Sequence, residues 1–442
     1  FDVRARLTDV RSEVLVPGRV LAGAELQVVA DNIGMSVAGA IRLGRVPGTA
    51  TWSTIFGPEG EGRSQVEGTV ELSEQFIDEF GIGLPTGAVR GAGQGAFRLD
   101  FGPDGPPVIS MTSDLTGLRL SLPAVGWGKS EGGTGSFSIT GQLGDVPTVD
   151  EVQLDAAGLQ TTGFIRLNSD GGLNRAVFNR VRLGGWLDSP VVLVRRGSGR
   201  PVEVQLGGGT LDLSRADFGG SDGGESGPMQ INLDRLQVTE GIALTGFQGT
   251  FSGAGGFQGN FTAQVNDGAA VNGTVAPGGS GTAVRVQSNA AGEVLASAGF
   301  LENARGGTMD LSLTPTTGEG SYDGTLRISS LRVRDAPALA QLIDAISVVG
   351  LLQQLDGQGL SFNQVDAAFR IDPDRITVSQ SSAVGPGLGI SMDGVYTQAT
   401  RQMDFRGVIS PLYLINGVGS VLTQRGEGLF GFNYTLRGPI GT

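Results

Sequence analysis

The chain has 442 residues, of which 44 are acidic and 31 basic, and a formal net charge of −13. Because it contains neither cysteine nor histidine, disulfides, thiolate metal sites, cysteine nucleophiles and histidine bases are all excluded. The acidic balance and the scattered arginines exclude the clustered basic face that nucleic acids require.

Little enzymatic chemistry is left after these exclusions. A hydrolase could still use a pair of carboxylates, but no spacing in the sequence singles out such a pair. We therefore expect no catalytic residue, no metal site and no cofactor. Glycine is abundant, at 76 residues, but it follows no Gly-X-Y period, which excludes collagen.

The first half of the chain alternates apolar and polar residues, which is typical of strands with one apolar and one wet side. At 97–101, for example, three apolar residues enclose Arg98 and Asp100. The apolar positions of the clearest runs are Phe97, Leu99, Phe101, Leu118, Leu120, Leu122, Val202, Val204 and Leu206.

One short helix is expected within this half, at 73–80. Ser73 is a suitable N-cap, acidic residues follow in the first turn, and Gly81 is a suitable residue just past the end. The three tryptophans, Trp52, Trp127 and Trp186, are far apart in the sequence. We interpret them as partly buried packing residues rather than as a membrane-interface belt.

The segment 219–227, with the sequence GGSDGGESG, is the best candidate for a linker. It separates an upstream β segment, 1–218, from a second β segment, 228–442. One sheet running through both segments is also compatible with the sequence.

Alternation continues in the second half, where its clearest apolar positions are Leu311, Leu313, Leu326 and Ile328. Turn signals recur every 8 to 12 residues, as at 266–268, 277–279 and 317–320. The segment 372–374 (Asp-Pro-Asp) is also interpreted as a hairpin turn rather than a calcium loop. This spacing predicts about 25 to 30 short antiparallel strands of about 5 to 6 residues each.

A second helix is expected at 336–355, where Leu339, Leu342, Ile343 and Ile346 have helical spacing. It would either cap one end of the sheet or serve as an ordinary crossover helix. This stretch is the closest approach to a membrane-spanning run, but Gln341, Asp344, Gln353 and Gln354 interrupt it. A membrane anchor is therefore expected only outside the chain.

A meander of so many strands has to curl, split or close, because an open twisted sheet rarely exceeds about ten strands. We expect an all-β fold, in which a long antiparallel meander sheet curls into an elongated U-shaped groove with one or two short amphipathic helices. The thirteen apolar positions named above would line the groove. The same pattern also fits a sheet whose apolar side is filled by its own side chains, which is the commoner arrangement.

The last part of the chain carries a series of motifs in a recognisable order: LDGQGLSF at 355–362, GPGLGI at 385–390, DFRGVISP at 404–411 and GEGLFGFNYTLRGP at 426–439. This order resembles the C-terminal region of the AsmA-like proteins, closest to the large YhdP-type members and related to TamB. Upstream, FGIGLP at 80–85 and LDLS at 211–214 follow the same order of features.

The resemblance implies a protein that an N-terminal helix, missing here, anchors in the inner membrane of a Gram-negative cell. Its periplasmic groove would carry phospholipid acyl chains toward the outer membrane and support outer-membrane lipid homeostasis, as in bridge-like lipid-transfer proteins. No individual residue is catalytic in that class. The chain departs from the family pattern in lacking both the anchor and the tail after 439.

Two other non-enzymatic functions remain open from the sequence. A structural β-solenoid would have parallel strands around a packed core. An assembly scaffold for outer-membrane proteins would pair a peptide strand with an exposed sheet edge.

Overall fold

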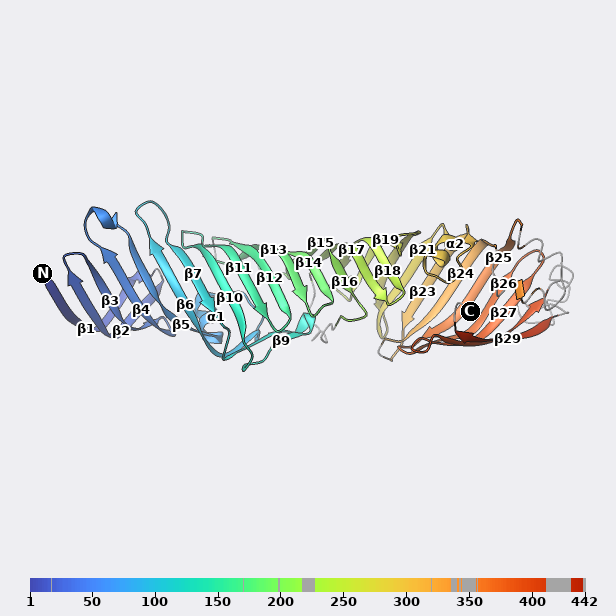
Figure 1. The fold of residues 1–442 in the computed structure, drawn as a ribbon, viewed down its shortest axis with the longest axis horizontal. Helices are drawn as coiled ribbons and strands as arrows, with labels where there is room; N and C mark the ends of the chain where they lie inside the picture. The colour runs from blue at the N-terminus through green and yellow to red at the C-terminus, as the bar shows by residue number, and fades with distance from the viewer. Residues whose placement is uncertain are drawn as a thin grey trace. The chain divides into compact units, whose positions relative to one another are not determined.

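The computed structural model describes the chain except for residues 17, 170, 198, 217–226, 319, 335–339, 342, 344–354, 356, 411–430 and 440–442. The described residues form 29 strands and very little helix (Figure 1). The chain divides into two compact units, Phe1–Gly224 (unit 1) and Glu225–Thr442 (unit 2). This division falls inside the segment 219–227, most of which lies outside the described residues.

Unit 1 contains sixteen strands, and several are much longer than the sequence pattern predicted. The bounds are β1 (Asp2–Val16), β2 (Arg19–Asp31), β3 (Gly34–Leu43), β4 (Val46–Ile55), β5 (Ser64–Ser73), β6 (Val89–Phe101), β7 (Val108–Ser113), β8 (Leu118–Leu122), β9 (Trp127–Lys129), β10 (Gly135–Gln142), β11 (Thr148–Ala156), β12 (Leu159–Leu167), β13 (Leu173–Leu183), β14 (Leu187–Val194), β15 (Glu203–Gly207) and β16 (Thr210–Asp212).

These strands form an antiparallel meander in which nearly every strand pairs with the one before and the one after it. Strand β16, which pairs with β14, is one exception, and a detour after β6 is another. One end of β6 pairs with β7, which in turn pairs with β10. The other end of β6 pairs with the short strand β8, which pairs with β9, and β8 and β9 form a flap. Bulges at several positions, such as the one between Ala22 and Leu26 of β2, help the long strands to bend.

The flap contains the only lysine of the chain. The Lys129 side chain is 2% exposed, and its ammonium donates hydrogen bonds to the carbonyl oxygens of Leu115 (2.7 Å), Leu118 (2.9 Å) and Ser130 (3.0 Å). All three ammonium protons therefore have backbone partners, which fastens β9 to the loop before β8.

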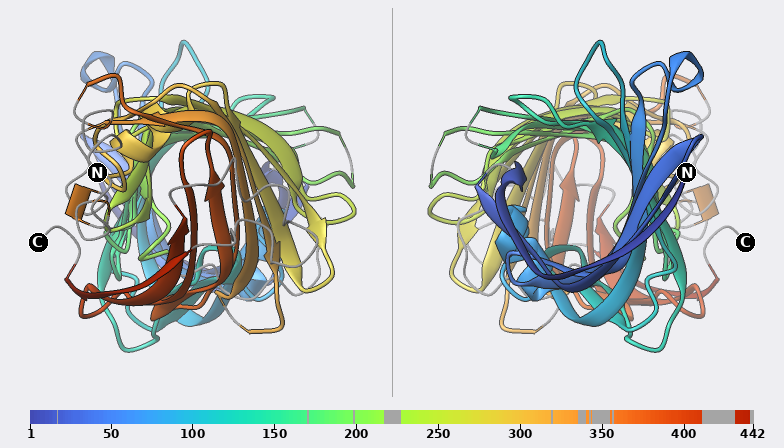
Figure 2. Two further views of the ribbon diagram at one scale, coloured as in Figure 1. Left: turned by 90° about the vertical axis from the view of Figure 1, so that its right-hand side faces the viewer. Right: turned by 90° about the vertical axis from the view of Figure 1, so that its left-hand side faces the viewer.

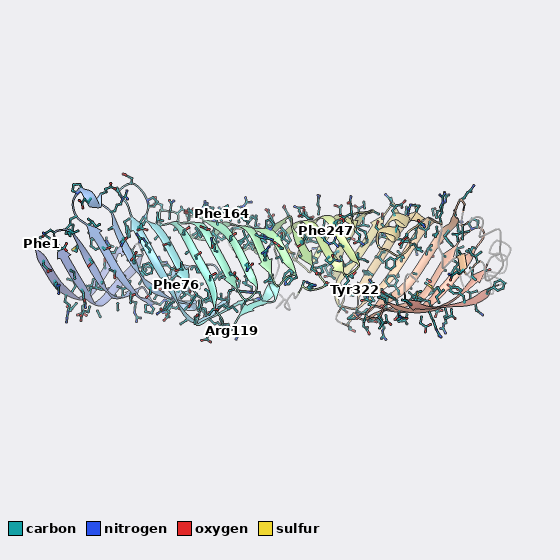
Figure 3. All side chains as sticks on the ribbon, in the orientation of Figure 1. Phe1, Phe76, Arg119, Phe164, Phe247 and Tyr322 are labelled. Carbon is teal, nitrogen blue, oxygen red and sulfur yellow. The ribbon has the colours of Figure 1, made fainter. Side chains whose placement is uncertain are left out.

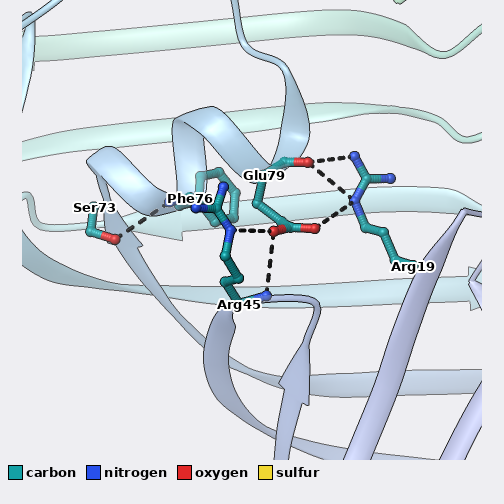
Figure 4. A network of polar contacts seen from close by, with 5 residues as sticks. All are labelled: Arg19, Arg45, Ser73, Phe76 and Glu79. Carbon is teal, nitrogen blue, oxygen red and sulfur yellow. Dashed lines mark hydrogen bonds and ion pairs between the residues drawn. The ribbon is translucent and has the colours of Figure 1, made fainter.

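Helix α1 (Glu74–Phe80) lies between β5 and β6, and it confirms the helix expected at 73–80. The Ser73 side chain accepts a hydrogen bond from the Phe76 amide at 3.4 Å, and Gly81 ends the helix with φ of 63°. The Glu79 carboxylate receives Arg45 at 3.1 Å, while the Arg19 guanidinium donates to the Glu79 carbonyl at 2.7 Å (Figure 4). Because Arg19 begins β2 and Arg45 lies between β3 and β4, α1 ties the β1–β2 and β3–β4 ends together along one rim of the sheet.

Unit 2 contains the remaining described strands. They are β17 (Met229–Thr239), β18 (Ile242–Ser252), β19 (Gln258–Val265), β20 (Ala270–Gly278), β21 (Gly281–Ser288), β22 (Ala304–Arg305), β23 (Thr308–Pro315), β24 (Tyr322–Val333), β25 (Leu360–Ile371), β26 (Arg375–Val384), β27 (Gly389–Thr397), β28 (Gln402–Ser410) and β29 (Phe432–Pro439).

Unit 2 is again an antiparallel meander, from β17 to β21 and from β23 to β29. A second helix, α2 (Ala291–Ser297), follows β21 and packs on β22 and β24. The sequence did not predict α2. It has only seven residues and no side-chain N-cap, so it lacks the signals by which a helix is recognised.

The strands of each unit curl into a U, as expected from the strand number. The strands of unit 2, yellow to red, bend around an arc in the left view of Figure 2, and those of unit 1, blue to green, do so in the right view. Every pairing that the structure describes is antiparallel, which contradicts the parallel β-solenoid alternative.

The predicted turns lie between consecutive strands. Asn266 and Asp267 adopt φ of 46° and 60° between β19 and β20. At 372–374, the Asp372 amide donates to the Arg375 carbonyl at 2.9 Å, which confirms a hairpin turn there. Most of the expected helix at 336–355, including Leu339, Leu342 and Ile346, lies outside the described residues.

Candidate functional site

One side of the unit 1 sheet carries apolar residues that continue from strand to strand. The cross-strand register places Val28, Val37, Trp52, Val66 and Leu99 in one row over β2 to β6. All five are half-buried. The row continues through Ile109 on β7 to Gly141 on β10.

The other side of the unit 1 sheet carries ion pairs. Arg98 on β6 contacts Glu67 at 2.8 Å and Asp100 at 2.9 Å. On β14, Asp188 receives Arg180 at 2.6 Å and Arg182 at 3.3 Å. Hydrogen bonding from Arg180, followed by that from Arg182, lowers the pKa of Asp188 to about 2.

Unit 2 repeats this division into an apolar and a polar side. The register over β24 to β28 aligns Ile328, Val365, Ala383, Ile390 and Ile409 in one row. The residues at the two ends of this row, Ile328 and Ile409, are buried, since each is 1% exposed. The three residues between them are half-buried.

A neighbouring part of the same side is less covered, and we call it the half-open side of unit 2. Its residues are half-buried in the middle of long strands, where a packed second layer would bury them completely. They are Leu326, Ala367, Phe369, Val378, Met392, Phe405 and Tyr434.

The opposite side of β21 to β29 carries a ladder of cross-strand ion pairs. Arg285 binds Asp310, and the remaining pairs are Arg327–Asp366 at 3.2 Å, Arg370–Asp323 at 3.0 Å, Arg406–Asp393 at 2.9 Å and Arg437–Asp404 at 2.9 Å. The arginine side chains of these pairs are 50–79% exposed. Because side chains splay apart on the outside of a curl and converge on the inside, we assign the polar side to the outside.

Strand length allows room inside such a curl. The strands β3, β4, β5 and β26 each have 10 residues. A strand of this length is about 33 Å long, and bent into a semicircle it spans about 21 Å from end to end. Two sheets whose side chains fill the space between them lie only about 10 Å apart. Longer strands than the sequence predicted therefore make a wider groove.

Part of the unit 2 sheet is nevertheless filled by its own side chains, and we call it the closed stretch. On β17 to β20, Leu233, Phe247, Phe251, Phe261 and Val271 are each 2–8% exposed. Phe247, labelled in Figure 3, stacks on Phe261 with ring centroids 5.1 Å apart. The apolar side of unit 2 thus changes from filled to half-open along the sheet.

The residues predicted to line the groove occupy several kinds of position. In unit 1, Phe97, Leu99, Val204 and Leu206 lie on the apolar side, and Phe101 lies at the end of β6, 36% exposed. Leu118, Leu120 and Leu122 belong instead to the flap strand β8, where Leu118 is 3% exposed. Val202 precedes β15 and lies in no strand.

In unit 2, the predicted residues Leu311 and Leu313 on β23 and Leu326 and Ile328 on β24 share the apolar side. Of the expected end-cap residues, Ile343 alone is described, and it is fully buried. Sequence reasoning missed the apolar side of β25 to β28, where glycine, alanine and serine interrupt the alternation. Trp52, which the sequence analysis interprets as a partly buried packing residue, is half-buried and lies in the apolar row of unit 1.

Three hydroxyl groups on the apolar side of unit 2 are turned into the sheet. Ser288 donates to the Ala270 carbonyl at 2.8 Å, Ser381 to the Met392 carbonyl at 2.7 Å, and Tyr434 to the Ser391 carbonyl at 3.0 Å. Burial, with a smaller effect from Asp393, raises the pKa of Tyr434 to about 12. These hydroxyls therefore do not interrupt the apolar character of that side.

Within the described part of the chain, no group of three or more acidic residues is arranged to hold a metal ion. Among the same residues, no helix has the length and apolar character needed to cross a membrane.

Comparison of the chain with protein-family models, with curated proteins and with solved structures found no match. The comparisons therefore do not identify the AsmA-like family.

Proposed function

We propose that the chain binds phospholipid acyl chains on its apolar sides and serves in non-enzymatic phospholipid transport between the inner and outer membranes of a Gram-negative cell. The observation that carries the proposal is the apolar row that passes from strand to strand while its side chains remain half-buried. Such a side is stabilised when hydrocarbon covers it, at about 25 cal/mol per Å².

Two further observations support hydrocarbon as the occupant. Hydroxyl groups on the apolar side of unit 2 donate to backbone carbonyls, so a polar ligand would find few partners there. The ion pairs lie on the opposite side of the sheet. The periplasmic location and the two membranes rest on the resemblance of the sequence motifs to the AsmA-like proteins.

Native mass spectrometry and lipid extraction of the purified chain test this proposal. We expect phospholipid to accompany the protein through purification and to be released by organic solvent. Repeated recovery of lipid-free protein that also fails to take up lipid from vesicles would contradict the proposal. The remaining alternative, an assembly scaffold, would then be favoured if an edge strand captured an outer-membrane protein peptide.

A further inference from the structure

Three aromatic rings on the half-open side of unit 2 lie over glycines of the neighbouring strand. Phe369 on β25 faces Gly324 on β24, Phe405 on β28 faces Gly394 on β27, and Tyr434 on β29 faces Gly407 on β28. In each case, a Cβ atom added to the glycine would fall closer than 3.0 Å to an atom of the aromatic side chain. We call these three the aromatic–glycine pairs.

The glycines allow the rings to lie down on the sheet. A side chain at position 324 would occupy the space that the Phe369 ring now fills, so the ring would have to stand up from the sheet. A ring lying flat presents a large apolar area but adds little height, which leaves the inside of the curl free. Aromatic rings over cross-strand glycines also stabilise strand pairing.

We propose that the aromatic–glycine pairs set the depth of the half-open side of unit 2, and that the hydrocarbon part of an acyl chain lies against these flat rings. This inference rests on the proposed function and names the part of the lipid that this side binds. The Ser381 and Tyr434 hydroxyls already donate to backbone carbonyls. A ligand group that needs a hydrogen bond is therefore disfavoured there.

The Gly324–Phe369 pair offers the sharpest test. The three atoms nearest to a Cβ at Gly324 all belong to the Phe369 ring, whereas at Gly394 and Gly407 a backbone carbonyl oxygen is nearer than the ring. Gly324→Ala therefore displaces a side chain and leaves the strand pairing intact. The other two glycine substitutions would strain the backbone.

The closed stretch contains a matched pair for comparison. At Gly273 on β20 the three nearest atoms likewise all belong to one ring, that of Phe261. Phe261 is 8% exposed and stacks on Phe247, whereas Phe369 is half-buried. Gly273→Ala should consequently lower stability with little effect on ligand binding. Gly324→Ala should weaken ligand binding with little effect on stability.

The experiment measures binding of cis-parinaric acid, a fluorescent fatty acid, to the full chain, with thermal unfolding followed in parallel. We expect Gly324→Ala to weaken binding about three- to tenfold with a small change in Tm, and Gly324→Ala/Phe369→Leu to restore binding because the leucine has no ring to displace. Gly279→Ala, in the β20–β21 turn where a Cβ meets nothing within 4 Å, should bind as the unchanged protein does.

Competition with stearic acid and 12-hydroxystearic acid tests the second part of the inference. The hydroxylated chain should compete about tenfold less well, because its hydroxyl would be buried without a partner. Equal competition by the two acids would contradict the exclusion of polar groups.

The outcomes separate the inference from the function on which it rests. If the unchanged protein binds the probe and Gly324→Ala binds it equally well, the aromatic–glycine pairs do not set the depth and the proposed function stands. If the unchanged protein binds neither the probe nor vesicle phospholipid, the proposed function and this inference both fail. Weakened binding that the double variant does not restore would also overturn the role of the ring.

Discussion

The closed stretch and the half-open side of unit 2 belong to one meander that has an apolar and a polar side throughout, but the apolar side is covered to a different extent in the two regions. On β17 to β20, Phe247 and Phe251 stack with parallel rings at 6.2 Å and are 5% and 7% exposed. On β24 to β28, Phe369 and Phe405 lie apart over glycines and remain half-buried. Alternation alone therefore does not decide whether a curled sheet is filled.

The difference shows that the fold needs packed apolar side chains along only part of the sheet. The closed stretch supplies tightly packed aromatic contacts, which contribute to stability in proportion to their burial. The half-open side relies more on backbone pairing and on the ion pairs of the outer side, so its inner surface is free for a ligand. Our predictions test this division, beginning with the largest effect.

The largest expected effect is on stability in the closed stretch. Phe247→Ala should lower the free energy of unfolding by about 3–5 kcal/mol, because it removes a ring that is 5% exposed and leaves a cavity. Phe369→Ala, on the half-open side, should lower it by about 1 kcal/mol. Urea unfolding of the two variants measures both values. Equal losses would remove the distinction between the two stretches.

The next effect is on lipid content. Val378→Asp places a charge on the half-open side and should lower the amount of co-purified lipid severalfold, because a carboxylate is strongly disfavoured against hydrocarbon. Gln380 lies on the same strand, β26, but is exposed on the polar side beyond a bulge. Gln380→Asp should leave the lipid content unchanged in the same extraction. A similar loss in both variants would argue against a side-specific effect.

A smaller effect is expected at high pH. Because burial raises the pKa of Tyr434 to about 12 from 10.0, the folded chain favours the neutral phenol. The corresponding stability is fully present below about pH 10 and is lost as the pH rises through about 12. Titration of tyrosinate absorbance should show that Tyr434 titrates late in the folded chain and normally in urea. A normal titration of all tyrosines in the folded chain would mean that Tyr434 is not buried.

The smallest effect is expected on the polar side. Arg406→Ala removes an exposed cross-strand pair with Asp393 at 2.9 Å, in which the arginine side chain is 79% exposed. Such a pair contributes about 0–1 kcal/mol, so urea unfolding should change by less than about 1 kcal/mol and lipid content should not change. A large loss of lipid in this variant would indicate that the ligand binds on the polar side of the sheet, which would contradict the proposal.

The sequence was sufficient for the all-β class, the curl and helix α1, because alternation, turn residues and the Ser73 N-cap are local signals. Strand length was underestimated, since bulges such as the one between Ala22 and Leu26 let a strand continue through a break in the pattern. Helix α2 was missed because it depends on tertiary packing, with Gly292 close against the Arg305 backbone.

The candidate site was only partly predictable. Residues in strongly alternating runs, such as Leu311 and Leu326, lie on the apolar side, but Leu118 belongs to the flap. Whether a side is filled depends on which residue faces which across strands. The pairing of Phe369 with Gly324 joins residues far apart in the sequence, and no local pattern contains it.

The three tryptophans of the chain allow the most direct test of hydrocarbon binding. Trp52 is half-buried in the apolar row of unit 1, whereas Trp127 and Trp186 are each 7% exposed, and Trp127 lies in the flap. A variant with Trp127→Phe and Trp186→Phe would report on Trp52 alone. We predict that phospholipid with brominated acyl chains quenches the fluorescence of Trp52, and that the same lipid with unbrominated chains does not. Unquenched Trp52 in a protein shown to carry the brominated lipid would contradict the claim that acyl chains lie on the apolar side.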